Sequence, residues 1–233
     1  MKELGKRYIL LGVGLLIMSF GVACSIKGAL GTSPISSLPY AMSRFLPLTV
    51  GVCTIMMHVG FILLQILILR RQYDPVQLIQ LPVALLFGYL TDFALWAVDG
   101  ITCGAYWQQW LVCLLGIGLV AIGVSCEVTA DVAVLAGEGV VLAVCKVAPI
   151  QFSTMKVLFD VTLVASACLL SLIFVGEIEG VREGTLAAAL LVGTWAFSLP
   201  GNASFYYSPA GQAFRVVGDH RQFEFLAFQT DRR

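Results

Sequence analysis

Polar side chains interrupt an otherwise apolar chain at three places, and these are the residues that could do chemistry. The first place is the stretch 27–33, which opens on Lys27 and ends on Ser33, just before Pro34. Serine is a favoured helix N-cap, and proline suits the first helical position. We expect a helix that directs its free N–H groups into the protein, so Lys27, Ser33 and Ser36 are candidate substrate-binding residues. A plain interfacial loop that reverses the chain is the alternative.

The second place is acidic. Glu127, Asp131 and Glu138 lie in the polar stretch 127–138. A carboxylate near a helix N-terminus stabilises that terminus by about 0.3–1 kcal/mol, and we expect this capping role for one of Asp131 and Glu138. Capping does not account for all three acids, so all three are candidate substrate-binding residues. If these acids line one side of a site and Lys27 lines the other, the two opposite charges suit a zwitterionic solute.

The third group lies inside long apolar segments, where an ionisable residue costs free energy and is therefore a candidate for a functional role. Lys156 and Asp160 are four residues apart, so they share a helix face and can neutralise each other. His58 and Asp160 occupy equivalent positions in two of these segments. We assign His58, Lys156 and Asp160 to coupling or gating, with a buried structural ion pair as the alternative. Asp92 is expected to snorkel near its helix end.

The composition shows which elements must position these groups. Of 233 residues, 59% are apolar and 12% are charged, against roughly 45–50% and 25% in soluble domains. Uncharged runs such as 8–26 and 48–69 match the length that crosses a bilayer.

The zero net charge indicates no nucleic-acid partner. The seven cysteines lack CxxC pairs, only two histidines are present, and enzyme motifs are missing, so we expect no metal, no cofactor and no catalysis.

An internal duplication organises the chain. A shift of 102 residues pairs Gly14 with Gly116 and Gly21 with Gly123, and the order of features repeats. The expected helices are about 8–26, 34–45, 48–69, 76–98, 110–126, a short piece ending at 146, 150–175 and 184–199. We therefore divide the chain into a first repeat (1–100), a second repeat (101–200) and a cytoplasmic tail (201–233).

The short segments decide the topology. About 12 residues span only about 18 Å, against roughly 30 Å of hydrocarbon. They are expected to be re-entrant half-helices, which leaves three crossings per repeat and inverts the second repeat. The predicted fold is an all-α polytopic membrane protein with two inverted repeats, each of three transmembrane helices plus one re-entrant half-helix. Basic residues then divide ten to three in favour of the side that holds both termini, which is typical of the cytoplasmic side.

Several short motifs, four of which contain glycine, resemble those of a known group. They occupy 28–34, 48–51, 137–139, 156–163 and 184–186. In these motifs the chain is similar to the YczE/YyaS/YitT group of bacterial integral membrane proteins over about residues 8–200. The resemblance implies a multi-pass protein of the bacterial cytoplasmic membrane. It supplies no substrate and no functional residue.

The functional expectation is secondary transport of a small polar or charged solute by alternating access, since discontinuous helices form substrate sites in inverted-repeat transporters. The alternative is a non-transporting membrane scaffold or regulatory partner of another protein complex. The expected partners are the small-molecule solute and the lipid bilayer. The sequence leaves a homo-oligomer open.

Overall fold

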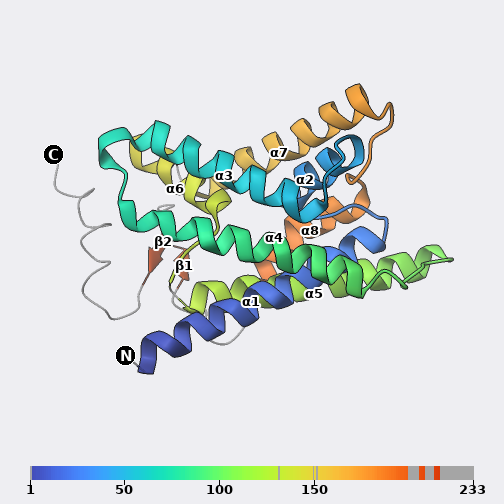
Figure 1. Ribbon diagram of the computed structural model, residues 1–233, viewed down its shortest axis with the longest axis horizontal. Helices are drawn as coiled ribbons and strands as arrows, with labels where there is room; N and C mark the ends of the chain where they lie inside the picture. The colour runs from blue at the N-terminus through green and yellow to red at the C-terminus, as the bar shows by residue number, and fades with distance from the viewer. Residues whose placement is uncertain are drawn as a thin grey trace.

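The computed structural model describes residues 2–130, 132–148, 150, 152–198, 205–207 and 213–215, and within them the chain is built from helices (Figure 1). The eight α-helices are α1 (Lys2–Lys27), α2 (Pro34–Phe45), α3 (Val50–Leu69), α4 (Gln80–Ala97), α5 (Tyr106–Ala130), α6 (Ala136–Val147), α7 (Phe152–Phe174) and α8 (Glu183–Ser198). Two 3₁₀ helices, η1 (Arg70–Gln72) and η2 (Pro75–Ile79), join α3 to α4. In the tail, β1 (Phe205–Tyr207) pairs antiparallel with β2 (Ala213–Arg215). The all-helical class is confirmed apart from these two strands, and most of the tail lies outside the described residues.

Five segments of the described chain are long and apolar enough to cross a membrane. They are Leu4–Lys27, Val50–Gln72, Pro75–Ala97, Tyr106–Ala130 and Thr154–Phe174. The expected sixth crossing, α8, has 16 residues and does not reach this length. Large apolar side chains such as Leu67 and Leu172 are exposed on the outside of the bundle, as a lipid environment requires.

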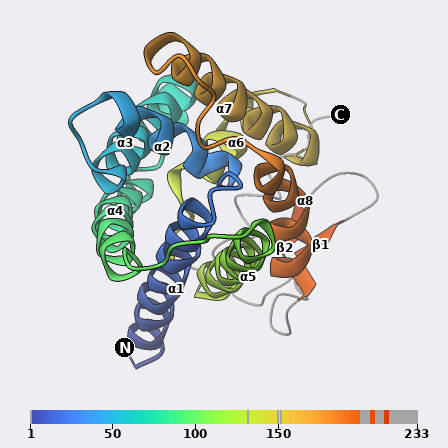
Figure 2. The same cartoon turned by 90° about the vertical axis from the view of Figure 1, so that its right-hand side faces the viewer.

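Helices α1 and α5 pack against each other in antiparallel directions and form the most extensive helix contact in the described chain (Figure 2). A Cβ atom added at Gly21 would lie 2.7 Å from the carbonyl oxygen of Gly116, and one at Gly14 would lie 3.1 Å from that of Gly123. Their backbones therefore approach more closely than any larger side chain allows. Small residues of this kind are typical of helix contacts within membranes.

The remaining helices pack in a reciprocal pattern. Helix α4 packs on α1, and α8 packs on α5. The short helix α2 packs on α7 of the other half of the chain, and the short helix α6 packs on α3 (Figure 1). Each short helix is thus held by a long helix from the opposite half.

Asp92 of α4 binds the N-terminus of α3. The hydroxyl of Thr49 donates to its Oδ2 at 2.6 Å, and the N–H of Gly51 donates to its Oδ1 at 2.7 Å. The approach is close because Gly51 faces Gly88 of α4. The expectation that Asp92 merely snorkels is therefore wrong. Its carboxylate satisfies N–H groups that a helix N-terminus leaves free.

Two helices extend beyond the boundaries expected for them. Helix α1 begins at Lys2, and α5 runs from Tyr106 to Ala130 rather than from about 110 to 126. Glu127 therefore lies in the last turn of α5, not in the break that follows it. The apolar pattern located the helix, but it could not show that the polar residues after Cys126 continue the helical hydrogen bonding.

The α1–α5 contact predicts a specific effect of a single methyl group. Gly21→Ala should destabilise the protein by about 1–3 kcal/mol, as overpacking of a close contact does. Gly12→Ala, on the same helix, is the matched control because nothing lies within 4 Å of its added Cβ. Thermal unfolding in detergent should show a lower midpoint for Gly21→Ala only. Equal midpoints for the two variants would contradict the close contact.

Candidate functional site

The turn between α1 and α2 is docked on the loop that joins α7 to α8. Gly31 has a φ of +99°, and a side chain there would strike Thr185, so the turn requires glycine. The N–H of Thr32 donates to the carbonyl of Gly180 at 3.1 Å, and the N–H of Gly184 donates to that of Leu30 at 2.8 Å. The first polar stretch (27–33), which we call the first break, is therefore held to the α7–α8 loop by hydrogen bonds on both of its sides.

Helix α2 ends at the same loop. Near its C-terminus, Arg44 forms an ion pair with Glu179, in which Nη2 donates to Oε1 at 3.2 Å. Gly180, which holds the start of α2 through Thr32, is the next residue along. One loop therefore contacts both ends of this 12-residue helix.

The second break, which is the polar stretch 127–138, and helix α6, which begins within it, contact α3 and the connection between α3 and α4. Oε1 of the buried Glu127 accepts a hydrogen bond of 2.7 Å from the N–H of Leu135, the N-cap of α6. Gln65 of α3 donates from Nε2 to the carbonyl of Ala136 at 3.0 Å. At the other end of α6, Lys146 donates to the carbonyl of Gln72 at 3.4 Å. The C-terminal end of α6 thus contacts the α3–α4 connection, and its N-terminal end contacts α3 at Gln65.

The N-terminal ends of the two short helices meet inside the protein. The side chain of Ile35, in α2, lies against Gly137, in α6, where a Cβ would be 2.5 Å from it. Ser33 is the N-cap of α2, as predicted, but its hydroxyl donates to Ser36 Oγ at 3.1 Å instead of capping the backbone. Both serines are buried. Two candidate residues from the first break therefore lie beside the start of the second short helix.

Charged residues gather at this meeting point. Lys156 Nζ donates to Asp160 Oδ1 at 2.8 Å, which confirms that they share a face of α7. Glu138, in the first turn of α6, interacts electrostatically with both of them and with Glu127. The structure therefore brings four of the nine candidate residues into one charged cluster, which we call the acidic cluster: Glu127, Glu138, Lys156 and Asp160.

The acidic cluster contains three carboxyl groups and one ammonium group. Full ionisation would leave an excess of two negative charges at a partly buried place in an apolar bundle, which is unfavourable. The N-terminus of α6 adds only a partial positive charge. Such a site is suited to hold a cation, a positively charged group or protons. Among the described residues, no group of three or more His, Cys, Asp or Glu side chains could hold a metal ion.

Five candidate residues are not part of this cluster: Ser33 and Ser36 at the start of α2, and Lys27, His58 and Asp131. Lys27 donates to Asp99 Oδ1 at 2.6 Å and to its carbonyl at 3.3 Å. This hydrogen bond and charge lower the pKa of Asp99 below its ordinary value. His58 is fully buried between the rings of Phe61 and Phe87, and its Nδ1 has no partner among the described residues. Asp131 lies outside the described residues.

Sequence reasoning missed one polar residue of this region. Gln65 is buried and connects three helices, because its Nε2 donates to Gln80 Oε1 at 3.0 Å as well as to α6. Gly139 leaves the room that its amide occupies. The sequence does contain a signal for Gln65, because a glutamine inside an apolar segment such as α3 costs free energy in a membrane unless its amide is hydrogen-bonded.

The fold and the charged interior define a polytopic helical protein with five segments able to cross a membrane. The chain belongs to DUF6198, a family of unknown function, whose model matches residues 5–197. It is 32% identical over 119 residues to the uncharacterised protein YyaS of Bacillus subtilis (strain 168). That alignment covers 51% of this chain and 57% of the relative, so the chain spans a little over half the length of YyaS. The similarity confirms the resemblance to the YyaS type of protein. No solved structure matches the chain.

The charge balance of the acidic cluster predicts that removing the charge of Lys156 destabilises the protein more than removing the charge of Asp160. Lys156→Gln removes the one ammonium group of the cluster, which pairs with Asp160 and interacts with Glu138. We expect a loss of about 2 kcal/mol of stability, below the 3–5 kcal/mol of a fully buried pair. Asp160→Asn should lose less, because Lys156 keeps Glu138 as a neighbour. Unfolding of both variants in detergent measures the difference. Greater damage from Asp160→Asn would show that Lys156 does not balance the cluster.

Proposed function

We propose that the protein is a secondary transporter that moves a small polar or charged solute across the bacterial cytoplasmic membrane by alternating access. In this proposal the chain consists of two inverted repeats, residues 1–100 and 101–200. Each repeat contributes one re-entrant half-helix, α2 or α6. Both termini lie in the cytoplasm. The solute binds where the two half-helices meet.

The α1–α5 contact supports the inversion of the repeats. Gly14 and Gly21 correspond to Gly116 and Gly123 by the shift of 102 residues. In the structure Gly14 contacts Gly123, and Gly21 contacts Gly116. Each glycine therefore contacts the counterpart of the other, which is the pattern that a two-fold axis produces. Because the two helices are antiparallel, this axis is perpendicular to them, as in inverted-repeat transporters.

The ends of the short helices support re-entrance. Helix α2 starts and ends beside the α7–α8 loop, through Thr32 and Arg44. Helix α6 has contacts from both of its ends to residues at or near the α3–α4 connection, through Ala136 and Lys146. A 12-residue helix whose two ends lie on the same side of the bilayer does not cross it.

The observation that best supports the proposal is that the N-termini of the two half-helices meet beside the partly buried acidic cluster. Discontinuous helices whose ends converge at the interface of two repeats form the substrate and coupling-ion sites of many transporters. The excess of carboxyl groups favours a solute with a positive group, zwitterions included, or a coupling proton or cation. Glu138 and Lys156 are the residues we expect to contact it, with Ser33 and Ser36 across from them.

The scaffold alternative has an observation in its favour, because the meeting point is partly filled. Ile35 packs on Gly137, and Glu127 is engaged as a cap of α6. A scaffold needs no water-filled path to this point. A transporter does, although the path is closed to each side for part of its cycle. Access of water to Ser36 therefore distinguishes the two functions.

We expect Ser36→Cys to react with a small charged thiol reagent from the aqueous phase, in a background in which the seven native cysteines are replaced. A charged reagent requires a polar path, since it does not partition into the bilayer interior. Labelling in intact membrane vesicles, followed by mass measurement, gives the extent of reaction.

Ser19→Cys is the matched control. Ser19 is fully buried on α1, where its hydroxyl donates to the carbonyl of Leu15, and it should remain unlabelled. If Ser36→Cys stays as unreactive as Ser19→Cys while an exposed cysteine at Gln72 reacts, the interior has no polar path. The transport proposal would then be abandoned in favour of the scaffold.

A further inference from the structure

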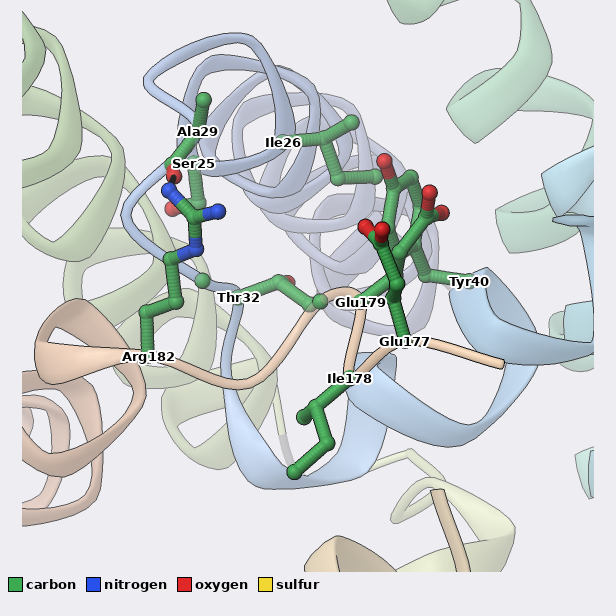
Figure 3. Close-up of a pocket in the computed structure, with 11 residues that line it drawn as sticks. Ser25, Ile26, Ala29, Thr32, Tyr40, Glu177, Ile178, Glu179 and Arg182 are labelled. Carbon is green, nitrogen blue, oxygen red and sulfur yellow. Dashed lines mark hydrogen bonds between the residues drawn. The ribbon is translucent and has the colours of Figure 1, made fainter. Parts of the chain in front are cut away.

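A pocket of about 190 Å³ lies between the α1–α2 turn and the α7–α8 loop (Figure 3). Its polar side chains come from Ser25, Thr32, Tyr40, Glu177, Glu179 and Arg182. None of these residues belongs to the acidic cluster, so the pocket is a separate site. It is smaller than the roughly 300–1,000 Å³ sites of drug-sized ligands. A molecule of a few heavy atoms fits it.

Thr32 is the feature that points to a ligand. Its side chain is 1% exposed, and its Oγ1 has no hydrogen-bond partner among the described residues. Its N–H is already bonded to Gly180, so the backbone fixes the residue in this place. Buried hydroxyl groups are almost always hydrogen-bonded. An atom held in the pocket would supply the missing partner.

Two opposite charges line the pocket without neutralising each other. The guanidinium of Arg182 donates to the carbonyl of Ala29 at 3.3 Å, which uses one of its five donors. Glu177 has no ion-pair partner in the described part of the chain, whereas Glu179 is already paired with Arg44. Figure 3 shows Arg182 on one side of the pocket, the two glutamates on the opposite side, and Thr32 between them.

We propose that this pocket binds a small zwitterion of the size of a short amino acid. Its carboxylate accepts hydrogen bonds from Arg182 and from the hydroxyl of Thr32, and its ammonium group faces Glu177. A simple anion would leave Glu177 facing a like charge, and a simple cation would do the same to Arg182. This inference goes beyond the transport proposal, because binding here requires no transport and is measured on the purified protein.

The test is a thermal-shift titration of the purified, detergent-solubilised protein, since a ligand of the folded state raises the unfolding midpoint. The probes are glycine, L-alanine, β-alanine and glycine betaine, each up to about 10 mM. Acetate and methylammonium, which carry one charge each, are the controls. At least one zwitterion should raise the midpoint, and neither control should do so at the same concentration.

Variants assign the effect to the pocket. Arg182→Gln, Glu177→Gln and Thr32→Val should each weaken the apparent affinity for the active zwitterion by about tenfold or more, as expected for charge-assisted contacts, while Thr32→Ser should retain it. Glu183→Gln, an exposed neighbour outside the pocket lining, is the matched control and should bind like the wild type. The proposal is overturned if no zwitterion shifts the midpoint, if acetate acts as well as glycine, or if Glu177→Gln binds with unchanged affinity.

Discussion

The close antiparallel contact of α1 with α5 is the constraint on which the rest of the structure depends. Without side chains at Gly14, Gly21, Gly116 and Gly123, the two backbones approach until carbonyl oxygens would touch an added Cβ. In a bilayer, where lipid is as apolar as the helices, such van der Waals fit is a main source of helix association. The contact also relates the two halves of the chain, because each glycine meets the counterpart of the other.

The positions of the remaining helices follow from this relation. Helix α4 packs on α1 and helix α8 packs on α5, so these two occupy corresponding positions, and each short helix packs on a long helix of the other half. That exchange brings the starts of α2 and α6 together at Ile35 and Gly137. The acidic cluster, by contrast, is formed by α5, α6 and α7, which all belong to the second half of the chain. Packing between the halves places the start of α2 beside this cluster.

The local features of the site could be predicted from the sequence, and the tertiary ones could not. Lys156 and Asp160 pair because four residues bring side chains onto one helix face, and Ser33 with Pro34 begins a helix through local preferences. The cap that Glu127 provides to α6 spans eight residues, and the pairing of Lys27 with Asp99 spans 72. Such contacts depend on how segments fold back on each other, which composition and periodicity do not specify. For this reason Lys27 was assigned to the substrate site although the structure holds it in another ion pair.

The central claim is that the second repeat is inverted relative to the first, and the sidedness of two equivalent connections tests it most directly. Gln72 follows α3, and Ile178 follows α7; both are exposed. Single cysteines at these positions, in a cysteine-free background, can be labelled with an impermeant thiol reagent in intact cells and in inverted vesicles. The account predicts that Gln72→Cys reacts only from the cytoplasmic side and Ile178→Cys only from the opposite side. Reaction of both from the same side would contradict the inversion, and with it the proposed transport site.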